Sequence, residues 1–191
     1  MGRVLKCYQE HLASGREVLY LCQDETRVGL KTLQGKVITA KGVKPVVEVQ
    51  GLRENFWLYG AISPQSGEYF LQERPKLNGE NFQSYLDWLS KQLGERYAVL
   101  QVDQAPAHTS HAIEWPDNII PLFQPAHSPE LNPIERLWQW LKRPMKNQSF
   151  PSLDELRTRV EEIFEELTLK KAMSLSGYDF IWDALFYAAS C

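Results

Sequence analysis

The sequence predicts an α/β protein in which helices cover the faces of a mixed sheet. Residues 46–74 contain two or three segments rich in β-forming residues, and SPQSG at residues 63–67 is a strong hairpin signal between two of them. After residue 78, helical periodicity alternates with short apolar strands. A meander followed by strand–helix crossovers puts antiparallel and parallel strands into one sheet.

Four further segments are predicted as strands or their connections. The first strand lies in EVLYLCQDET, where the apolar run Val18–Cys22 ends in acids. Residues 31–45 contain two glycines and a proline and are typical of a loop or an irregular hairpin. RYAVLQVDQ predicts a short buried strand that ends at Asp103, and NIIPLFQP predicts another that its prolines keep short or at an edge.

Helical spacing of apolar residues predicts three long helices. NGENFQSYLDWLSKQLG forms the first, with its terminal glycine as the stop. The second begins at Pro133, where Asn132 would be the N-cap and Glu135 would complete a capping box. The third opens at Ser152 with another capping box.

Length and composition indicate a single cytoplasmic domain over residues 1–191. A hydrophobic fraction of 43% suits a globular protein, and no apolar run is long enough to cross a bilayer. The N-terminus lacks a signal-peptide core. Three widely spaced cysteines fit reduced thiols rather than a disulfide framework. We therefore expect no membrane association.

Charge is unevenly distributed along the chain. The net charge of −3 argues against a protein that coats nucleic acid nonspecifically. From Thr26 to Val47 there is no acid among several lysines and an arginine, whereas Asp154–Glu166 carries six acids. The acidic segment is interpreted as a solvated helix face, and the basic segment alone allows either a solvated surface or a phosphate contact.

Three carboxylates lie where α/β proteins assemble their sites. Asp24 ends the first predicted strand, Asp103 ends the strand after the first helix, and Glu135 lies in the first turn of the next helix. If the two strands are neighbours, Asp24 and Asp103 approach one another and repel unless a cation or a proton intervenes. Oxygen ligands select Mg²⁺ or Mn²⁺, and two such ions about 4 Å apart would clamp a phosphodiester displacement.

Each acid also has a purely structural interpretation. Asp24 could cap a turn, Asp103 could open an Asx-turn, and Glu135 could serve only its capping box. Glu25 is not expected to join Asp24, because adjacent strand residues point to opposite faces. Glu130 is interpreted as a surface residue or a supporting group.

The histidines leave several options open. His108 and His127 lie in predicted loops near the acids, as solvated side chains or as hydrogen-bonding or phosphate-contacting groups. No zinc spacing is present. A Ser128–His108–Asp103 hydrolase is conceivable, but no nucleophile-elbow motif supports it.

Three blocks of the sequence resemble a known family. QDET, VDQAPAHTS and HSPELNPIERLWQWLK are similar to the catalytic blocks of DDE transposases, most closely the bacterial insertion-sequence branch of the mariner superfamily. The third block is the most specific, and 31 residues separate Asp103 from Glu135, near the spacing of this superfamily. The resemblance covers about residues 16 to 170.

The resemblance implies a ribonuclease H-like fold with a mixed five-stranded sheet. It implies that Asp24, Asp103 and Glu135 are catalytic and hold two divalent ions, Mg²⁺ or Mn²⁺. In the family, a DDE endonuclease nicks DNA at the transposon ends, and the freed 3′ hydroxyl attacks target DNA, which gives DNA transposition, recombination and integration. The remaining candidates for supporting hydrogen bonds or DNA contacts are His108, His127, Asn132, Arg27, Arg136 and Lys142.

The sequence departs from the family pattern in two respects. Gln104 stands where the family most often has asparagine. Only about twenty residues precede Asp24, so no N-terminal helix-turn-helix domain is expected, and the chain is interpreted as the catalytic half. Implied partners are transposon-end and target DNA, a second copy in a homodimer, and a separate or frameshift-fused helix-turn-helix segment. The apolar tail Phe180–Tyr187 is a candidate contact for the second copy.

Two alternatives to a transposase remain. One is another ribonuclease H-like nuclease, which would not need the SPELNPIE block. The other is a decayed or domesticated transposase domain that binds DNA or a partner without cutting it.

Overall fold

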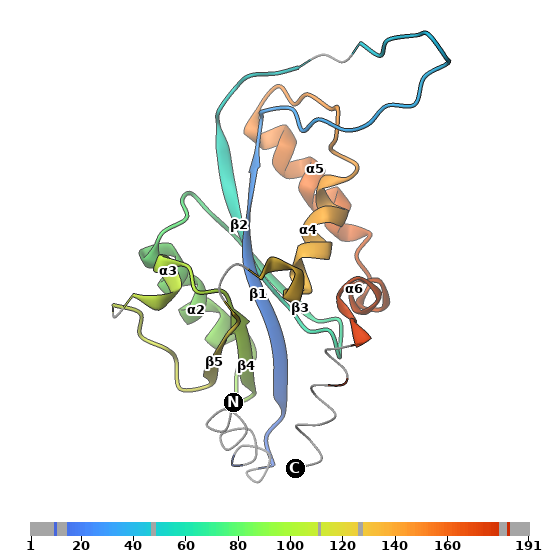
Figure 1. Ribbon diagram of the computed structural model, residues 1–191. Coiled ribbons are helices and arrows are strands. Elements are labelled where there is room, and N and C mark those ends of the chain that lie inside the picture. The colour runs from blue at the N-terminus through green and yellow to red at the C-terminus, as the bar shows by residue number, and fades with distance from the viewer. Residues whose placement is uncertain are drawn as a thin grey trace.

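The computed structural model describes residues 10, 15–46, 49–110, 112–125, 128–179 and 183. One sheet of five strands runs through the molecule in the order β3-β2-β1-β4-β5, with helices on both faces (Figure 1). The predicted mixed five-stranded α/β fold is therefore confirmed. The apolar tail Phe180–Tyr187 lies outside the described residues except for Asp183.

The strands combine a meander with two parallel additions. Their bounds are β1 Val18–Gly29, β2 Asn55–Ile62, β3 Tyr69–Arg74, β4 Tyr97–Val102 and β5 Ile119–Phe123. β2 pairs antiparallel with both β1 and β3. β4 pairs parallel with β1 and with β5. The predicted meander and crossovers are both present, and β1 lies at the centre of the sheet.

Helices cover the two faces of the sheet separately (Figure 1). On one face lie α2 (Gly79–Leu93), capped by the Asn78 side chain and ended by Gly94 as predicted, and the short α3 (Pro106–Thr109). On the other lie α4 (Ile134–Lys142), α5 (Leu153–Glu165) and α6 (Leu169–Ser176). A 3-10 turn, η1 (Pro129–Leu131), leads into α4.

The period-2 alternation of β1 divides the core into two layers. Leu19 and Leu21 pack toward α2, whereas Tyr20 and Cys22 pack toward α4 and α5. Along the same strand, Asp24 falls on the α4 side, and Glu25 falls on the α2 side. Two consecutive acids thus enter different layers of the molecule.

β1 is longer than the sequence predicted. Pairing with β4 ends at Cys22 and Gln101, but pairing with β2 continues as far as Gly29 opposite Asn55. Asp24 therefore lies inside a strand rather than at its end. Asp24 lies just beyond the end of the pairing between β1 and β4, because β4 pairs with β1 only as far as Cys22.

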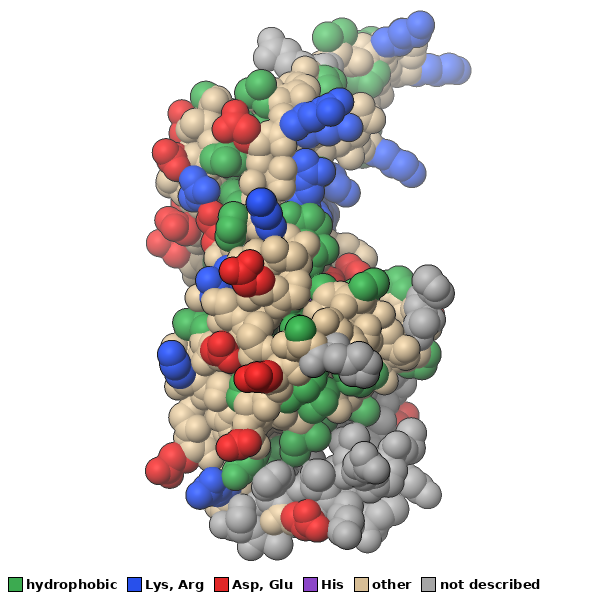
Figure 2. All heavy atoms as spheres, turned by 90° about the vertical axis from the view of Figure 1, so that its left-hand side faces the viewer, with side chains coloured by type: hydrophobic (Ala, Val, Ile, Leu, Met, Phe, Trp, Pro, Cys, Tyr) green, Lys and Arg blue, Asp and Glu red, His purple; other side chains and the backbone are tan. Residues whose placement is uncertain are grey.

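Residues 31–46 and 49–54, here called the projecting segment, belong to a long connection that extends away from the sheet (Figure 1). Hydrogen bonds tie its base, since the Thr32 N–H donates to the Gln50 carbonyl at 3.2 Å and the Asn147 N–H donates to the Leu33 carbonyl at 2.7 Å. Basic side chains gather over this end of the molecule (Figure 2). Its exposed apolar residues among those described are Leu33, Val37, Ile38, Val43, Val46, Val49 and Leu52.

Within the described part of the chain, no helix combines the length and the apolar character needed to cross a bilayer.

Candidate active site

Asp24 and Asp103 lie level with one another at neighbouring strands. Cys22 pairs with Gln101 in the parallel β1–β4 ladder, and the two aspartates each lie two residues further along. Glu135, in the first turn of α4, approaches from the helix layer on the Asp24 side. All three residues line one cavity of about 310 Å³. The structure thus brings together the three acids predicted from sequence.

Asp24 is held by a tryptophan of α4. The Trp138 Nε1–H donates to Asp24 Oδ2 at 3.0 Å. Burial raises the pKa of Asp24 to about 8, the nearby charges of Glu25 and Glu135 add to the rise, and the Trp138 hydrogen bond opposes it. A cation bound beside these carboxylates would relieve their repulsion.

The Trp138 ring fits against Asp24 because a glycine stands beside it. Gly60 of β2 is the register partner of Asp24. A Cβ at Gly60 would lie 2.6 Å from Cη2 of Trp138 and 2.9 Å from Cδ2 of Leu71. Only the absence of a side chain at this position lets the indole reach the carboxylate.

The start of α4 differs from the predicted capping box. The Asn132 N–H, which the box would pair with Glu135, donates instead to the Pro129 carbonyl at 2.9 Å. The Asn132 amide donates to the carbonyl of Gln23 in β1 at 2.8 Å, a buried contact, and its oxygen accepts only a long bond of 3.4 Å from Ile134. Pro133 is the N-cap, with no side-chain capping bond. Asn132 therefore fastens α4 to β1 rather than capping it.

Glu135 faces a lysine at the far end of its own helix. Burial raises the pKa of Glu135, and the charge of Lys142 opposes the rise. Burial in turn lowers the pKa of Lys142, and the charges of Glu135 and Asp24 oppose that change. Lys142 thus balances part of the negative charge of the acids.

Asp103 is fixed by a buried histidine. Asp103 Oδ1 lies 2.6 Å from Nδ1 of His108 and accepts the Ala105 N–H at 2.9 Å. The His108 hydrogen bond lowers the pKa of Asp103. Burial alone would lower the pKa of His108, but its hydrogen bonds to Asp103 and Glu25 outweigh burial and raise it to about 10.

Of the three roles that the sequence allowed for His108, the structure shows a buried hydrogen-bonding group, and not a solvated loop residue or an exposed phosphate contact. It lies in α3, its side chain is 1% exposed, and its ring packs on Phe82 with 4.2 Å between centroids. Carboxylates occupy both of its ring nitrogens. Neither nitrogen remains for Ser128, which argues against the hydrolase alternative.

Glutamine side chains secure the turn that precedes α4. Gln101 accepts a hydrogen bond from the Tyr20 hydroxyl. Its amide donates to Gln124 Oε1 at 2.9 Å and to the Leu131 carbonyl at 3.1 Å. Gln104, which departs from the family's asparagine, donates to the Gln124 carbonyl at 2.8 Å. These bonds set η1, and with it Glu135, against the ends of β4 and β5.

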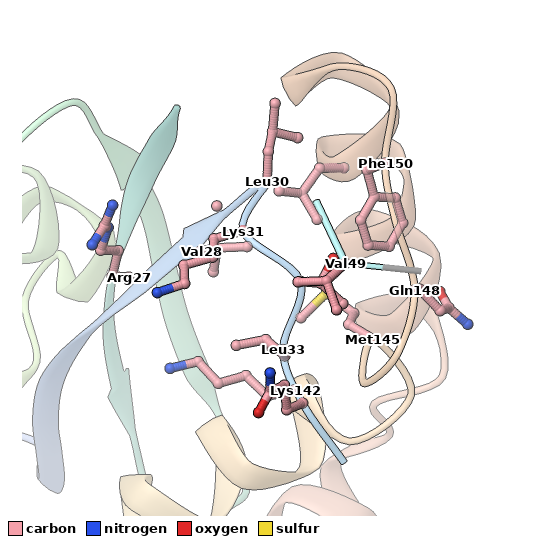
Figure 3. Close-up of a pocket in the computed structure, with 14 residues that line it drawn as sticks. Arg27, Val28, Leu30, Lys31, Leu33, Val49, Lys142, Met145, Gln148 and Phe150 are labelled. Atoms are coloured by element: carbon pink, nitrogen blue, oxygen red, sulfur yellow. The ribbon is translucent and has the colours of Figure 1, made fainter. Parts of the chain in front are cut away.

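Basic side chains adjoin the acids on the α4 side. A cavity of about 710 Å³ is bordered by Asp24 and Glu135 and by the basic residues Arg27, Lys142, Arg143 and Lys146. A neighbouring cavity of about 470 Å³ shares Arg27 and Lys142 with it. In that cavity the charged ends of Arg27 and Lys142 lie on one side, and Met145 and Phe150 lie on the other (Figure 3).

One sequence candidate, Arg136, is not brought to the acids. The Arg136 guanidinium lies over the Tyr178 ring, 4.0 Å from its centroid, and so turns toward the end of α6. His127 lies outside the described residues. Among the residues described, no three or more His, Cys, Asp or Glu side chains converge closely enough to hold a metal ion together.

Sequence reasoning missed Trp138 and Glu25. Trp138 was not among the sequence candidates, although a buried indole N–H usually requires an acceptor. Glu25 was excluded because it points away from Asp24, which is correct. It nevertheless reaches the site from the other layer, since its Oε1 lies 3.1 Å from Nε2 of His108.

The fold and the acids define a class of protein, and comparison with known proteins agrees with it. A family model described as DDE superfamily endonuclease matches residues 20–157, and the chain belongs to this family. An uncharacterized protein, y4pE/y4sA, of Sinorhizobium fredii (strain NBRC 101917 / NGR234) is 33% identical over 104 residues, which are 53% of this chain and 77% of that protein.

Named relatives are transposases of the Tc1/mariner type. The transposable element Tcb1 transposase of Caenorhabditis briggsae is 38% identical over 77 residues, 35% of this chain and 28% of that protein. A Mos1 transposase paired-end complex with the left transposon end aligns with a TM-score of 0.65 and 20% identity, over 92% of this chain and 55% of that one. The structural similarity confirms the predicted ribonuclease H-like fold. This chain spans only part of both transposases.

Proposed function

We propose that this domain is the catalytic domain of a transposase, which cleaves DNA at transposon ends and joins the freed ends to target DNA. The observation that carries the proposal is the common cavity of Asp24, Asp103 and Glu135, which come from two strands and a helix. The family match supports it, because the matched residues 20–157 include all three acids.

The chemistry of the three carboxylates suits divalent metal ions, although the described side chains do not converge closely enough in this structure to hold one. They are hard oxygen donors, and the raised pKa of Asp24 and of Glu135 means that a nearby cation would stabilise their charged forms. We propose that the three acids hold two ions, Mg²⁺ or Mn²⁺. When bound, such ions supply Lewis-acid stabilisation of the attacking and leaving oxygens of a phosphodiester. Complexes of the related Mos1 transposase carry Mn in one structure and Mg in another by their descriptions.

The chain's own side chains have distinct tasks in this proposal. Trp138 and His108 orient the Asp24 and Asp103 carboxylates through the hydrogen bonds described above. Arg27, Lys142, Arg143 and Lys146 border the adjoining cavity, where they would bind phosphates of the DNA backbone. A scissile phosphate would then lie between the three carboxylates and these basic side chains.

The assembly that recognises transposon ends is a further part of the proposal. We propose a homodimer on paired ends, with a helix-turn-helix segment, separate or fused, that reads the end sequence. The Mos1 complexes are described as paired-end complexes, which supports this arrangement. The exposed apolar side chains of the projecting segment offer a surface for a second copy.

A variant of one acid tests the proposal. We expect Asp103→Asn to abolish Mn²⁺-dependent nicking of supercoiled DNA that carries the element's ends, because the amide removes a negative metal ligand while keeping its shape. Nicking is measured by the conversion of supercoiled to open-circular plasmid. The matched control is Asp117→Asn, in an exposed turn away from the cavity, which should retain full activity. Undiminished nicking by Asp103→Asn would exclude the proposed mechanism.

A further inference from the structure

Glu25 is a buried acid that the proposed metal site does not use. Its side chain is 4% exposed, on the α2 side of β1, and Tyr59 is its register partner in β2. The charge of Glu25 adds to the effect of burial in raising the pKa of Tyr59 and of Tyr85. A carboxylate buried among aromatic rings is costly unless it is paired and hydrogen-bonded. The fold therefore retains Glu25 for a specific contact.

That contact is His108. Glu25 Oε1 lies 3.1 Å from His108 Nε2, and the opposite nitrogen, Nδ1, lies 2.6 Å from Asp103 Oδ1. Because both partners are carboxylates, the ring nitrogens act as donors in these bonds. Gln23 Nε2 donates to the same Glu25 oxygen at 2.8 Å, and Phe82 packs on the ring. The result is a chain of contacts that crosses the sheet edge from one core layer to the metal-site cavity.

We propose that Glu25 is a positioning residue for Asp103. By fixing the His108 ring, Glu25 holds Oδ1 of Asp103 and leaves Oδ2 for the cavity that Asp103 lines. This inference rests on the proposed function, since it assigns Glu25 to the orientation of a metal ligand. Groups that orient a metal ligand in this way affect metal affinity about 10- to 100-fold.

Two variants of Glu25 separate positioning from packing. Glu25→Gln keeps the length of the side chain and can still hydrogen-bond the His108 ring. Glu25→Leu keeps an apolar volume but removes the hydrogen bond. Glu73, in β3 of the same sheet, gives a control, because its carboxylate accepts hydrogen bonds from Arg157 of α5 but does not line the acidic cavity. Glu73→Gln and Glu73→Leu are made in parallel.

The test measures Mn²⁺ binding by calorimetry in the absence of DNA. We expect Glu25→Leu to weaken Mn²⁺ binding at least about 10-fold, Glu25→Gln to restore it to within about 3-fold of wild type, and both Glu73 variants to bind as wild type does. Equal binding by folded Glu25→Leu and wild type would overturn the inference. So would equal weakening by Glu25→Gln and Glu25→Leu, because a packing role does not distinguish the hydrogen-bonding side chain.

A double variant keeps the test decisive if Glu25→Leu does not fold. Glu25→Leu/His108→Phe replaces the pair by apolar groups and leaves no buried charge without its partner. We expect it to bind Mn²⁺ as weakly as His108→Phe alone, since both residues act through one contact. A further weakening in the double variant would overturn the inference. Failure of the wild type to bind Mn²⁺ would instead refute the proposed metal site.

Discussion

At the residue scale, Asp24 makes the free energy of unfolding of the metal-free protein depend on pH. Its pKa is raised to about 8, so between about pH 4 and pH 8 the folded state binds a proton that the unfolded state has released. The free energy of unfolding therefore falls as pH rises through this window. The pKa of His108 is also raised, so His108 adds a fall in the free energy of unfolding above its ordinary pKa. Substitution of Asp24 alone separates the two contributions.

We expect Asp24→Asn to flatten this pH dependence. In the presence of a chelator, the variant should be more stable than wild type by about 1–3 kcal/mol at pH 8 and similar to it near pH 4, because one pKa unit corresponds to about 1.4 kcal/mol and the side chain is only half-buried. Urea unfolding at a series of pH values measures the difference. Parallel stability curves for the two proteins would contradict the assignment.

Gly60 is a second residue whose role depends on its immediate surroundings. We expect Gly60→Ala to destabilise the protein by about 1–3 kcal/mol, because the new Cβ would collide with the buried Trp138 ring at 2.6 Å. The indole must move, and Asp24 loses its donor. Thermal unfolding and tryptophan fluorescence report the change. Gly51→Ala, where a Cβ meets nothing within 4 Å, is the control, and equal behaviour of the two variants would refute the packing argument.

At the element scale, α4 is placed by polar contacts at its start rather than by a capping box. We expect Asn132→Ala to destabilise the protein by about 1–3 kcal/mol, since the buried Gln23 carbonyl loses its amide donor. Asn55→Ala removes an exposed hydrogen bond from the Asn55 side-chain amide to the Arg53 carbonyl. It should change the free energy of unfolding far less. Denaturant unfolding compares them, and similar destabilisation by both would argue against the buried bond.

The elements themselves were largely predictable from the sequence. Period-3.6 apolar spacing, the stop at Gly94 and the cap at Ser152 located α2 and α5, because local residues determine these features. The extent of β1 could not be predicted, since QDETRVG has no continuous apolar run and is held by pairing with β2. The capping box at Glu135 was a sequence match that a tertiary hydrogen bond of Asn132 overrides.

The site was predictable in part for the same reason. The shared cavity of Asp24, Asp103 and Glu135 could be anticipated from the predicted strand and helix ends together with the family resemblance, although Asp24 lies inside β1. Contacts between layers do not follow from any local pattern. Glu25 reaches Asp103 only through His108, and Trp138 reaches Asp24 only because residue 60 has no side chain.

At the scale of the whole molecule, charge is separated between regions. Lys and Arg gather at the end that carries the projecting segment (Figure 2). Helix α5 carries most of the acids of the segment Asp154–Glu166. DNA is therefore expected on the side of Arg27, Lys142 and Lys146, where repulsion by α5 is least. The net charge of −3 alone would not have indicated such a face.

We expect the double variant Arg27→Ala/Lys146→Ala to bind DNA more weakly and with less dependence on salt. Each phosphate that the protein no longer neutralises lowers the slope of log Kd against log salt concentration by about 0.9, so the slope should fall by about 2. Fluorescence anisotropy with duplex DNA at several salt concentrations measures it. Arg159→Ala on α5, where Arg159 is paired with Glu162, is the control. An unchanged slope in the double variant would place the DNA elsewhere.

The tied base of the projecting segment has a consequence for how the chain tolerates change in length. Thr32 and Gln50 are joined to one another, and Leu33 is joined to Asn147, so the loop is closed next to the sheet whatever its outer residues do. Closing a flexible loop of twice the length costs only about 0.6 kcal/mol more. Insertions and deletions between these anchor points should therefore change the free energy of folding of the catalytic core very little. The segment can vary in length and sequence while the acids stay in place.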